Sequence, residues 1–165
     1  MHYCRIPASY FRKRFGFEHL PDFDRSIWKA VQQETEQAIR PLPESLITGS
    51  DISVKALEAT QANLAVLPGG ADIKLKAIDF RNIKSLENST IVCNPPYGLR
   101  LQKKEGIEKF YRDLGDFLKQ HCKGSNAYIY FGDRQLIKCI GLRSSWKKPL
   151  ASGGLDGRLV KLEMF

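Results

Sequence analysis

A short apolar run, residues 90–93, is followed directly by Asn94-Pro95-Pro96-Tyr97. Two consecutive prolines fix φ at about −65° and remove two backbone donors, so Asn94 and Pro95 present carbonyl oxygens without a competing N–H. Such acceptors suit a planar exocyclic amino group, which offers two hydrogens. Tyr97 can lie flat against the ring that carries the amine, because base–aromatic stacking contributes about 1–3 kcal/mol. The pattern favours transfer of a group onto the amino nitrogen of a nucleobase.

By itself, the tetrapeptide is equally compatible with a stiff turn after a strand. Two aspartates support the functional interpretation. Asp51 follows a short buried strand predicted over 45–49, and Asp79 follows an alternating strand pattern over 73–78. Ligands of open α/β sheets gather at the carboxyl ends of strands. We therefore expect Asp51, Asp79 and Asn94 to lie on one rim of the sheet.

Helices and strands alternate along the chain, which predicts an open α/β sheet. One helix is expected over 23–39 with Asp24 as its N-cap, another begins at an Asp51 N-cap, and a third runs through 107–118. Residues 127–131 give the clearest strand, whereas 135–139 is ambiguous. The segments 146–151 and 159–165 flank glycines and predict a closing antiparallel hairpin.

The composition is that of one ordinary globular domain: 165 residues, 42% hydrophobic and 27% charged. The formal net charge is +8. The excess of positive charge lies in the C-terminal part of the chain, where residues 119–161 include nine Lys or Arg and, as opposing charges, only Asp133 and Asp156. A basic surface suits a polyanion such as RNA, although charge alone is equally compatible with a solvated face that has no partner.

Four cysteines show no Cys-x-x-Cys spacing, and three histidines are scattered, so no metal site is expected. No apolar stretch approaches the ~20 residues that span a bilayer, and no signal peptide is recognisable. These features predict reduced thiols, no membrane partner and a cytoplasmic location.

Residues 91–101 resemble motif IV of amino-group methyltransferases that use S-adenosylmethionine. Within that group, residues 94–101 are similar to the branch that methylates guanine N2 of large-subunit ribosomal RNA. Further matches to this family are Phe15-Gly16-Phe17 with Ile27-Trp28, Gly49-Ser50-Asp51, Asp79-Phe80, Gly141-Leu142-Arg143 and residues 153–158. The resemblance implies a Rossmann-like class I methyltransferase sheet with a closing antiparallel hairpin.

The same resemblance implies a cofactor site for S-adenosylmethionine. Asp51 would accept hydrogen bonds from the ribose hydroxyls of the cofactor, and its neighbour Ile52 would also contact the cofactor. Asp79 would accept the adenine amino group, and Phe80 would pack beside the adenine ring.

The resemblance also implies catalytic and substrate-binding roles. Asn94, which also borders the cofactor, and Pro95 would hold the guanine amine and aim its lone pair at the sulfonium methyl. Pro96 stiffens this motif, and Tyr97 would stack on the target base. The loop after the motif would contact phosphates of ribosomal RNA through Arg100, Lys103 and Lys104. These three residues are equally compatible with an exposed basic loop that binds nothing.

The family's cofactor loop, Asp-Pro-x-Cys-Gly-Ser-Gly-Thr after the first strand, is not found in this chain. We therefore expect 1–165 to be a partial methyltransferase catalytic domain, with a helical lead-in (1–40) and a sheet region (41–165). The absent first strand would lie between the strands that bear Asp51 and Asn94, so both would lack a neighbour. A complementing chain or N-terminal segment would then carry the glycine loop.

Two alternatives stay open. A DNA adenine-N6 methyltransferase is one, because Asn-Pro-Pro-Tyr serves both amines. A non-catalytic RNA-binding remnant is the other, because the glycine loop is absent.

Overall fold

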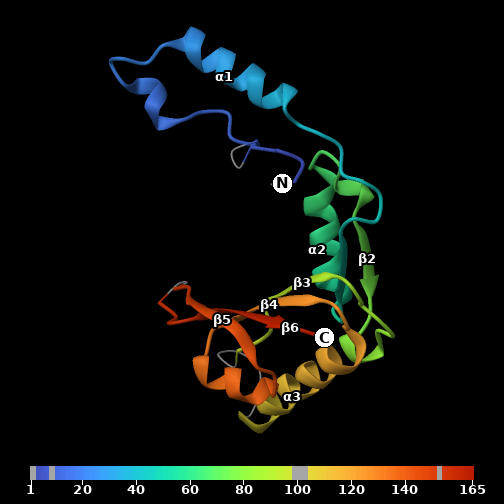
Figure 1. The fold of residues 1–165 in the computed structure, drawn as a ribbon. Helices are drawn as coiled ribbons and strands as arrows, with labels where there is room; N and C mark the ends of the chain where they lie inside the picture. Colours follow the sequence, from blue (N-terminus) through green and yellow to red (C-terminus); the bar gives the residue numbers. More distant parts are fainter. Residues whose placement is uncertain (1–2, 8–9, 98–103, 152–153) are drawn as a thin grey trace. The chain divides into compact units, whose positions relative to one another are not determined.

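The computed structural model describes residues 3–7, 10–97, 104–151 and 154–165. The chain divides into two compact units, Met1–Ala77 and Ile78–Phe165. Each unit has its own sheet, two-stranded in the first and four-stranded in the second (Figure 1). No helix within the described ranges has the length and apolar character needed to cross a membrane.

The first unit begins with an aromatic cluster and helix α1 (Arg25–Gln37). As predicted, Asp24 caps this helix, and its carboxylate accepts from the N–H groups of the second and third residues after it. Trp28 packs edge-on against Phe15 and Phe17, with ring centres 5.2 and 5.0 Å apart. Phe15 and Phe17 of the Phe-Gly-Phe segment therefore form one local cluster with Trp28.

The sheet of the first unit pairs β1 (Thr48–Asp51) with β2 (Lys74–Ala77) in parallel, and α2 (Val54–Ala65) connects them. Strand β1 begins three residues later than the predicted 45–49. The predicted Asp51 helix cap is also wrong. Ser53 is the N-cap, and its hydroxyl accepts from the backbone N–H three residues on, at 3.2 Å. Asp51 is the last residue of the strand.

The second unit is a mixed sheet in the order β3-β4-β6-β5. β3 (Thr90–Cys93) runs parallel to β4 (Asn126–Phe131), and α3 (Lys104–His121) connects the two. β6 (Arg158–Glu163) is antiparallel to both β4 and the edge strand β5 (Ser144–Pro149). The predicted closing hairpin is confirmed.

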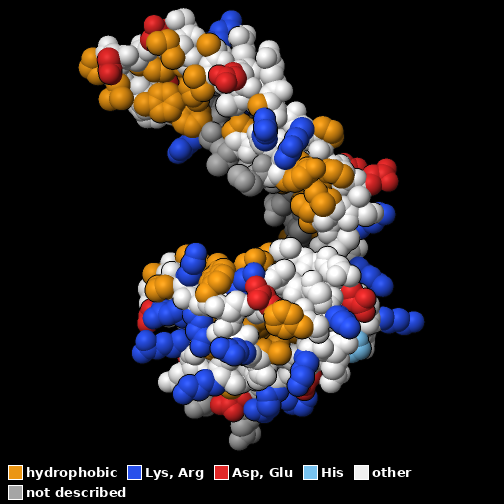
Figure 2. Space-filling view, viewed as in Figure 1, with side chains coloured by type: hydrophobic (Ala, Val, Ile, Leu, Met, Phe, Trp, Pro, Cys, Tyr) orange, Lys and Arg blue, Asp and Glu red, His pale blue; other side chains and the backbone are white. Residues whose placement is uncertain are grey.

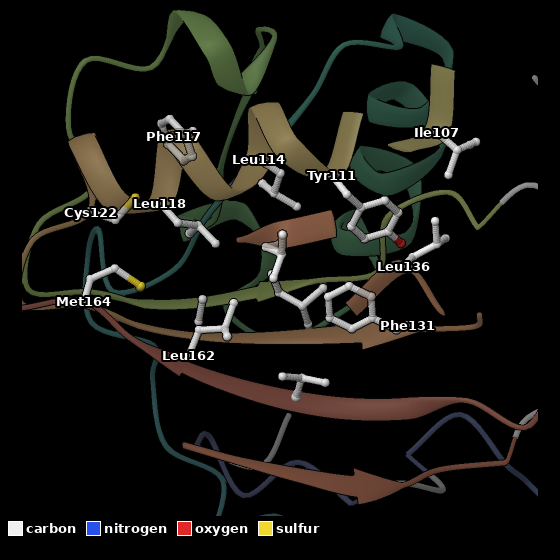
Figure 3. Close-up of a cluster of buried hydrophobic side chains, with 14 residues drawn as sticks. Ile107, Tyr111, Leu114, Phe117, Leu118, Cys122, Phe131, Leu136, Leu162 and Met164 are labelled. Atoms are coloured by element: carbon white, nitrogen blue, oxygen red, sulfur yellow. The ribbon is translucent and has the colours of Figure 1, made fainter. Parts of the chain in front are cut away.

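The main core of the second unit lies between α3 and one face of this sheet (Figure 3). α3 follows a helical spacing of apolar residues and presents that stripe to alternate positions of β4 and β6. The fully buried side chains of the unit include Tyr111, Leu118, Ile129, Phe131, Val160 and Leu162. The ambiguous 135–139 segment is a 3₁₀ helix, η4 (Arg134–Ile140), which packs against α3.

Strands β1 and β3 each have one open edge. Among the described residues, β1 pairs only with β2 and β3 only with β4. Val92, in the middle of β3, is 79% exposed. That a missing strand would lie between the strands that bear Asp51 and Asn94 stays a prediction, because the two strands belong to different units.

Gly115→Ala tests the packing of α3 on η4. Alanine normally stabilises a helix interior by about 1 kcal/mol relative to glycine. At Gly115, however, a Cβ would overlap the backbone carbonyl oxygen of Ile140. We expect the substitution to lower the free energy of unfolding by about 1–3 kcal/mol instead, as measured by denaturant unfolding. A stabilised variant would contradict the close approach.

Candidate functional site

The Asn-Pro-Pro-Tyr motif leaves β3 at its carboxyl end, where it was predicted. Cys93, the last residue of β3, is in parallel register with Ile129 of β4. Asn94 is exposed, whereas Pro95 behind it is buried. The buried proline anchors the turn, and the exposed Asn94 amide is available to accept a hydrogen bond from an amino group.

Tyr97 is half-buried and packs against the core of the second unit. Its ring packs edge-to-face with that of Tyr130, from β4, with an interplanar angle of 84° and ring centres 6.1 Å apart. This contact fixes the aromatic residue of the motif against the neighbouring strand.

Tyr111 of α3 lies behind the same sheet edge. It has no exposed surface, and its ring stacks on Phe131 at 5.1 Å between centres (Figure 3). Burial raises the pKa of its hydroxyl, and the acidic groups of Cys93 and Asp133 raise it further. Because Cys93 ends β3 and Asp133 follows β4, this neutral phenol is near the edge that bears the motif.

The carboxylate of Asp79 is held in one orientation. Its Oδ1 accepts from the backbone N–H of Arg81 at 2.9 Å, which caps the short 3₁₀ turn η3 (Phe80–Asn82). Its Oδ2 accepts from the guanidinium of Arg81, also at 2.9 Å. Carboxylate oxygens have further lone pairs, so Asp79 can still accept from a ligand.

Arg81 connects this turn to α3. Its Nε donates to Asp113 at 3.0 Å, and Lys109 also pairs with Asp113 at 3.0 Å. Burial opposes the charge on Arg81, but hydrogen bonds to Asp113 and Asp79 outweigh it and raise its pKa. The hydrogen bond from Lys109 and, after it, the one from Arg81 lower the pKa of Asp113.

Phe80 anchors the same turn. Its ring meets Phe110 and Phe117 of α3 edge-on, with ring centres 5.4 and 5.6 Å apart. The Arg81 guanidinium lies over the Phe80 ring at 4.8 Å. Phe80 is thus half-buried in protein contacts, and its place beside an adenine stays a prediction.

Arg81→Ala is expected to lower the free energy of unfolding by about 1 kcal/mol, after allowance for solvent screening. The substitution removes the cation paired with Asp79, one of the two cations paired with Asp113, and the cation over the Phe80 ring. Lys109→Ala removes one i,i+4 pair and should cost only about 0.3–0.5 kcal/mol. Denaturant unfolding at low and high salt measures both. Equal losses would show that the Arg81 network adds nothing beyond one surface pair.

Asp51 is an exposed carboxylate at the carboxyl end of β1. Its Oδ1 accepts from the N–H of Ser53 at 2.7 Å. The adjacent Ile52 is 72% exposed. Asp51 pairs in register with Ala77, and Asp79 follows two residues later. A rim shared by Asp51, Asp79 and Asn94 stays a prediction, because Asp79 and Asn94 belong to the second unit and Asp51 to the first.

The phosphate-contacting roles of Arg100, Lys103 and Lys104 stay predictions. Arg100 and Lys103 lie outside the described residues, and Lys104 begins α3 without a described side chain. Lys and Arg side chains nevertheless gather over the second unit (Figure 2). The exposed ones include Arg143, Lys147 and Lys148, on and beside β5.

Sequence reasoning missed the residues that support the site. Arg81 and Asp113 are 32 positions apart, and no local pattern connects them. Gly132, which directly follows the clearest predicted strand, lies in close contact with the Tyr97 ring, and its residue type is a signal that the sequence does contain. A glycine at the carboxyl end of such a strand often marks a close approach of another group.

Comparisons with known proteins place the chain among methyltransferases. The RMKL-like methyltransferase domain model matches residues 3–161. The Synechocystis sp. protein slr0064, named as an RNA methyltransferase, is 33% identical over 161 residues, covering 97% of this chain and 42% of its own length. The Photobacterium profundum ribosomal RNA large subunit methyltransferase K/L is 31% identical over 151 residues, covering 88% and 21%. This chain thus spans less than half of either relative.

Solved structures share the fold. SMU.472, described as a methyltransferase complexed with SAH, matches with a TM-score of 0.88 and 23% identity, over 100% of this chain and 44% of that one. A Listeria monocytogenes protein described as a predicted N6-adenine-specific DNA methylase matches with a TM-score of 0.76 and 22% identity, over 94% and 40%. The fold is the mixed-sheet α/β methyltransferase fold. Because the family model matches nearly its whole length, the chain belongs to the RMKL-like methyltransferase family.

Proposed function

We propose that this chain takes part in S-adenosylmethionine-dependent methylation of an exocyclic base amine, guanine N2 of large-subunit ribosomal RNA. The observation that carries the proposal is the exposed Asn94 amide at the carboxyl end of β3, between the buried Pro95 and a paired strand. Family membership supports methyl transfer. The relatives named as ribosomal RNA methyltransferases support the RNA substrate, and the resemblance of 94–101 supports guanine N2.

The described residues fit S-adenosylmethionine as the cofactor. Asp51 offers an exposed carboxylate whose Oδ2 has no hydrogen-bond partner among the described residues, which suits ribose hydroxyls. Asp79 offers a carboxylate already fixed by Arg81, which suits the adenine amine. The exposed Ile52 offers apolar surface beside Asp51. When bound, the cofactor supplies an electrophilic methyl group on its sulfonium sulfur.

The motif positions the nucleophile. The Asn94 side-chain oxygen and the Pro95 carbonyl accept the two hydrogens of the amine, which aims the nitrogen lone pair at the methyl carbon. Methyl transfer would form the nitrogen–carbon bond and break the carbon–sulfur bond, whose electron pair would stay on the sulfur of S-adenosylhomocysteine. The acceptors would stabilise the hydrogens of the positively charged nitrogen until one proton passes to solvent. Tyr97 stacks on the target base after that base leaves its own stack.

Two further features support the complete reaction. The basic surface of the second unit suits RNA phosphates. Three further cations, Arg100, Lys103 and Lys104, follow the Asn-Pro-Pro-Tyr motif in the sequence. The open edges of β1 and β3 suit an additional parallel strand, from another segment or another chain, that carries the glycine loop.

The test compares ribosomal RNA and duplex DNA as methyl acceptors and identifies the methylated nucleoside by mass spectrometry. The chain is assayed alone and in a chimera in which it replaces the matching segment of slr0064. N2-methylguanosine in RNA is the expected product. N6-methyladenosine in DNA would establish the adenine alternative instead. A chimera that binds RNA and S-adenosylhomocysteine yet methylates neither acceptor would indicate a non-catalytic RNA-binding protein.

A further inference from the structure

The ring of Tyr97 lies on a glycine. A Cβ on Gly132 would stand 2.6 Å from Cγ of Tyr97 and 2.8 and 2.7 Å from its Cδ1 and Cδ2. Nearly equal distances to three adjacent ring atoms place this point over the face of the ring rather than beside its rim. Carbon atoms in contact need about 3.5–4.0 Å. Only glycine therefore leaves room for the ring.

The backbone of Gly132 is held by the elements on both sides of it. It directly follows Phe131, the last residue of β4, and precedes Asp133, whose carboxylate accepts from the N–H of Gln135 at 2.8 Å to cap η4. Because β3 and β4 are parallel, Gly132 stands at the same sheet edge as the motif. The Tyr97 ring thus lies on backbone fixed by a strand before it and a helix cap after it.

A second contact connects Tyr97 to the closing hairpin. Tyr130, whose ring crosses that of Tyr97, has its hydroxyl end against Gly157, where a Cβ would overlap the Tyr130 hydroxyl. Gly157 directly precedes β6. Two glycines with no space for a side chain therefore flank the Tyr130–Tyr97 pair.

We infer that Gly132 is a positioning residue for base recognition: it seats one face of the Tyr97 ring and leaves the opposite face to the target base. The identity of that base rests on the proposed function. An alanine at Gly132 would displace the ring by about 1 Å to restore ordinary carbon contacts. A displacement of about 1 Å can cost about 100-fold in rate.

The seat itself can be tested on the 165-residue chain without a ligand. One Hα proton of Gly132 points at the Tyr97 ring, so we expect a strong upfield ring-current shift of that proton by NMR. The shift should vanish in Tyr97→Leu. It should persist in Gly16→Ala, since a Cβ at Gly16 meets nothing within 4 Å. An ordinary Gly132 Hα shift in the parent chain would overturn the inference.

The role is tested by a double-mutant cycle in the slr0064 chimera with ribosomal RNA. We expect Gly132→Ala to lower kcat about 100-fold and Tyr97→Leu about 10–100-fold, both with unchanged affinity for S-adenosylhomocysteine. The double variant should lose no more than the worse single variant, because Gly132 acts through Tyr97. Additive losses would overturn the inference. A parent chimera that shows the ring-current shift but no methylation would refute the proposed function, and the role in base recognition with it, while the seat stands.

Discussion

Asn94→Ala, introduced into the slr0064 chimera, is expected to lower the rate of methyl transfer by at least about 100-fold, because the target amine loses the acceptor that orients its lone pair. The affinity for S-adenosylhomocysteine should stay within about threefold, equivalent to less than about 0.7 kcal/mol. The basis is the exposure of Asn94 directly after β3, whereas the cofactor contacts proposed for the carboxylates are made by Asp51 and Asp79. Single-turnover methylation and calorimetry measure the two quantities.

Asn94→Gln is the matched variant. It retains the amide but moves it by one methylene, so a comparable loss would show that position rather than mere presence of the acceptor matters. Retention of full activity in Asn94→Ala, or loss of cofactor affinity in that variant, would refute the role assigned to this residue.

Without a further strand, the 165-residue chain is expected to bind S-adenosylmethionine with a Kd no tighter than about 1 mM, or about −4 kcal/mol. Asp51 ends β1 and Asn94 follows β3, and each of these strands has an open edge among the described residues. Carboxylate and amide groups that are not pre-organised must be ordered on binding, which weakens affinity.

Calorimetric titration of S-adenosylmethionine into the chain and into the chimera measures this difference. Saturable micromolar binding by the chain alone, about −8 kcal/mol, would show that the cofactor site forms without the additional strand. Asp51→Ala in the chimera is the control: it should weaken binding if the cofactor occupies the site that includes this carboxylate.

Local signals predicted much of the fold. The Asp24 cap gave the start of α1, and the apolar run before Asn94 matches β3 residue for residue. β4 was expected over 127–131, and the observed strand begins one residue earlier, at Asn126. These elements carry strong propensity, caps or alternation within a few residues, and the placement of Asn94 at a strand end followed directly.

Elements that depend on distant partners were predicted poorly. β1 contains Gly49, Ser50 and Asp51, which have little strand propensity, and it exists because β2 pairs with it. The N-cap of α2 is Ser53 rather than the predicted Asp51, because pairing with β2 extends the strand through Asp51. The supports of the site, such as the Arg81–Asp113 pair and the Gly132 seat, bring together residues far apart in the chain, which no spacing rule detects.

The open edge of β3 has a consequence that is independent of catalysis. Its four residues, Thr90–Cys93, include no charge and no proline, and Val92 is largely exposed. Native proteins usually protect such an edge, since it can act as a template for extended segments of other molecules. A strand that pairs with this edge would therefore lower the tendency of the polypeptide to aggregate, in addition to carrying cofactor contacts.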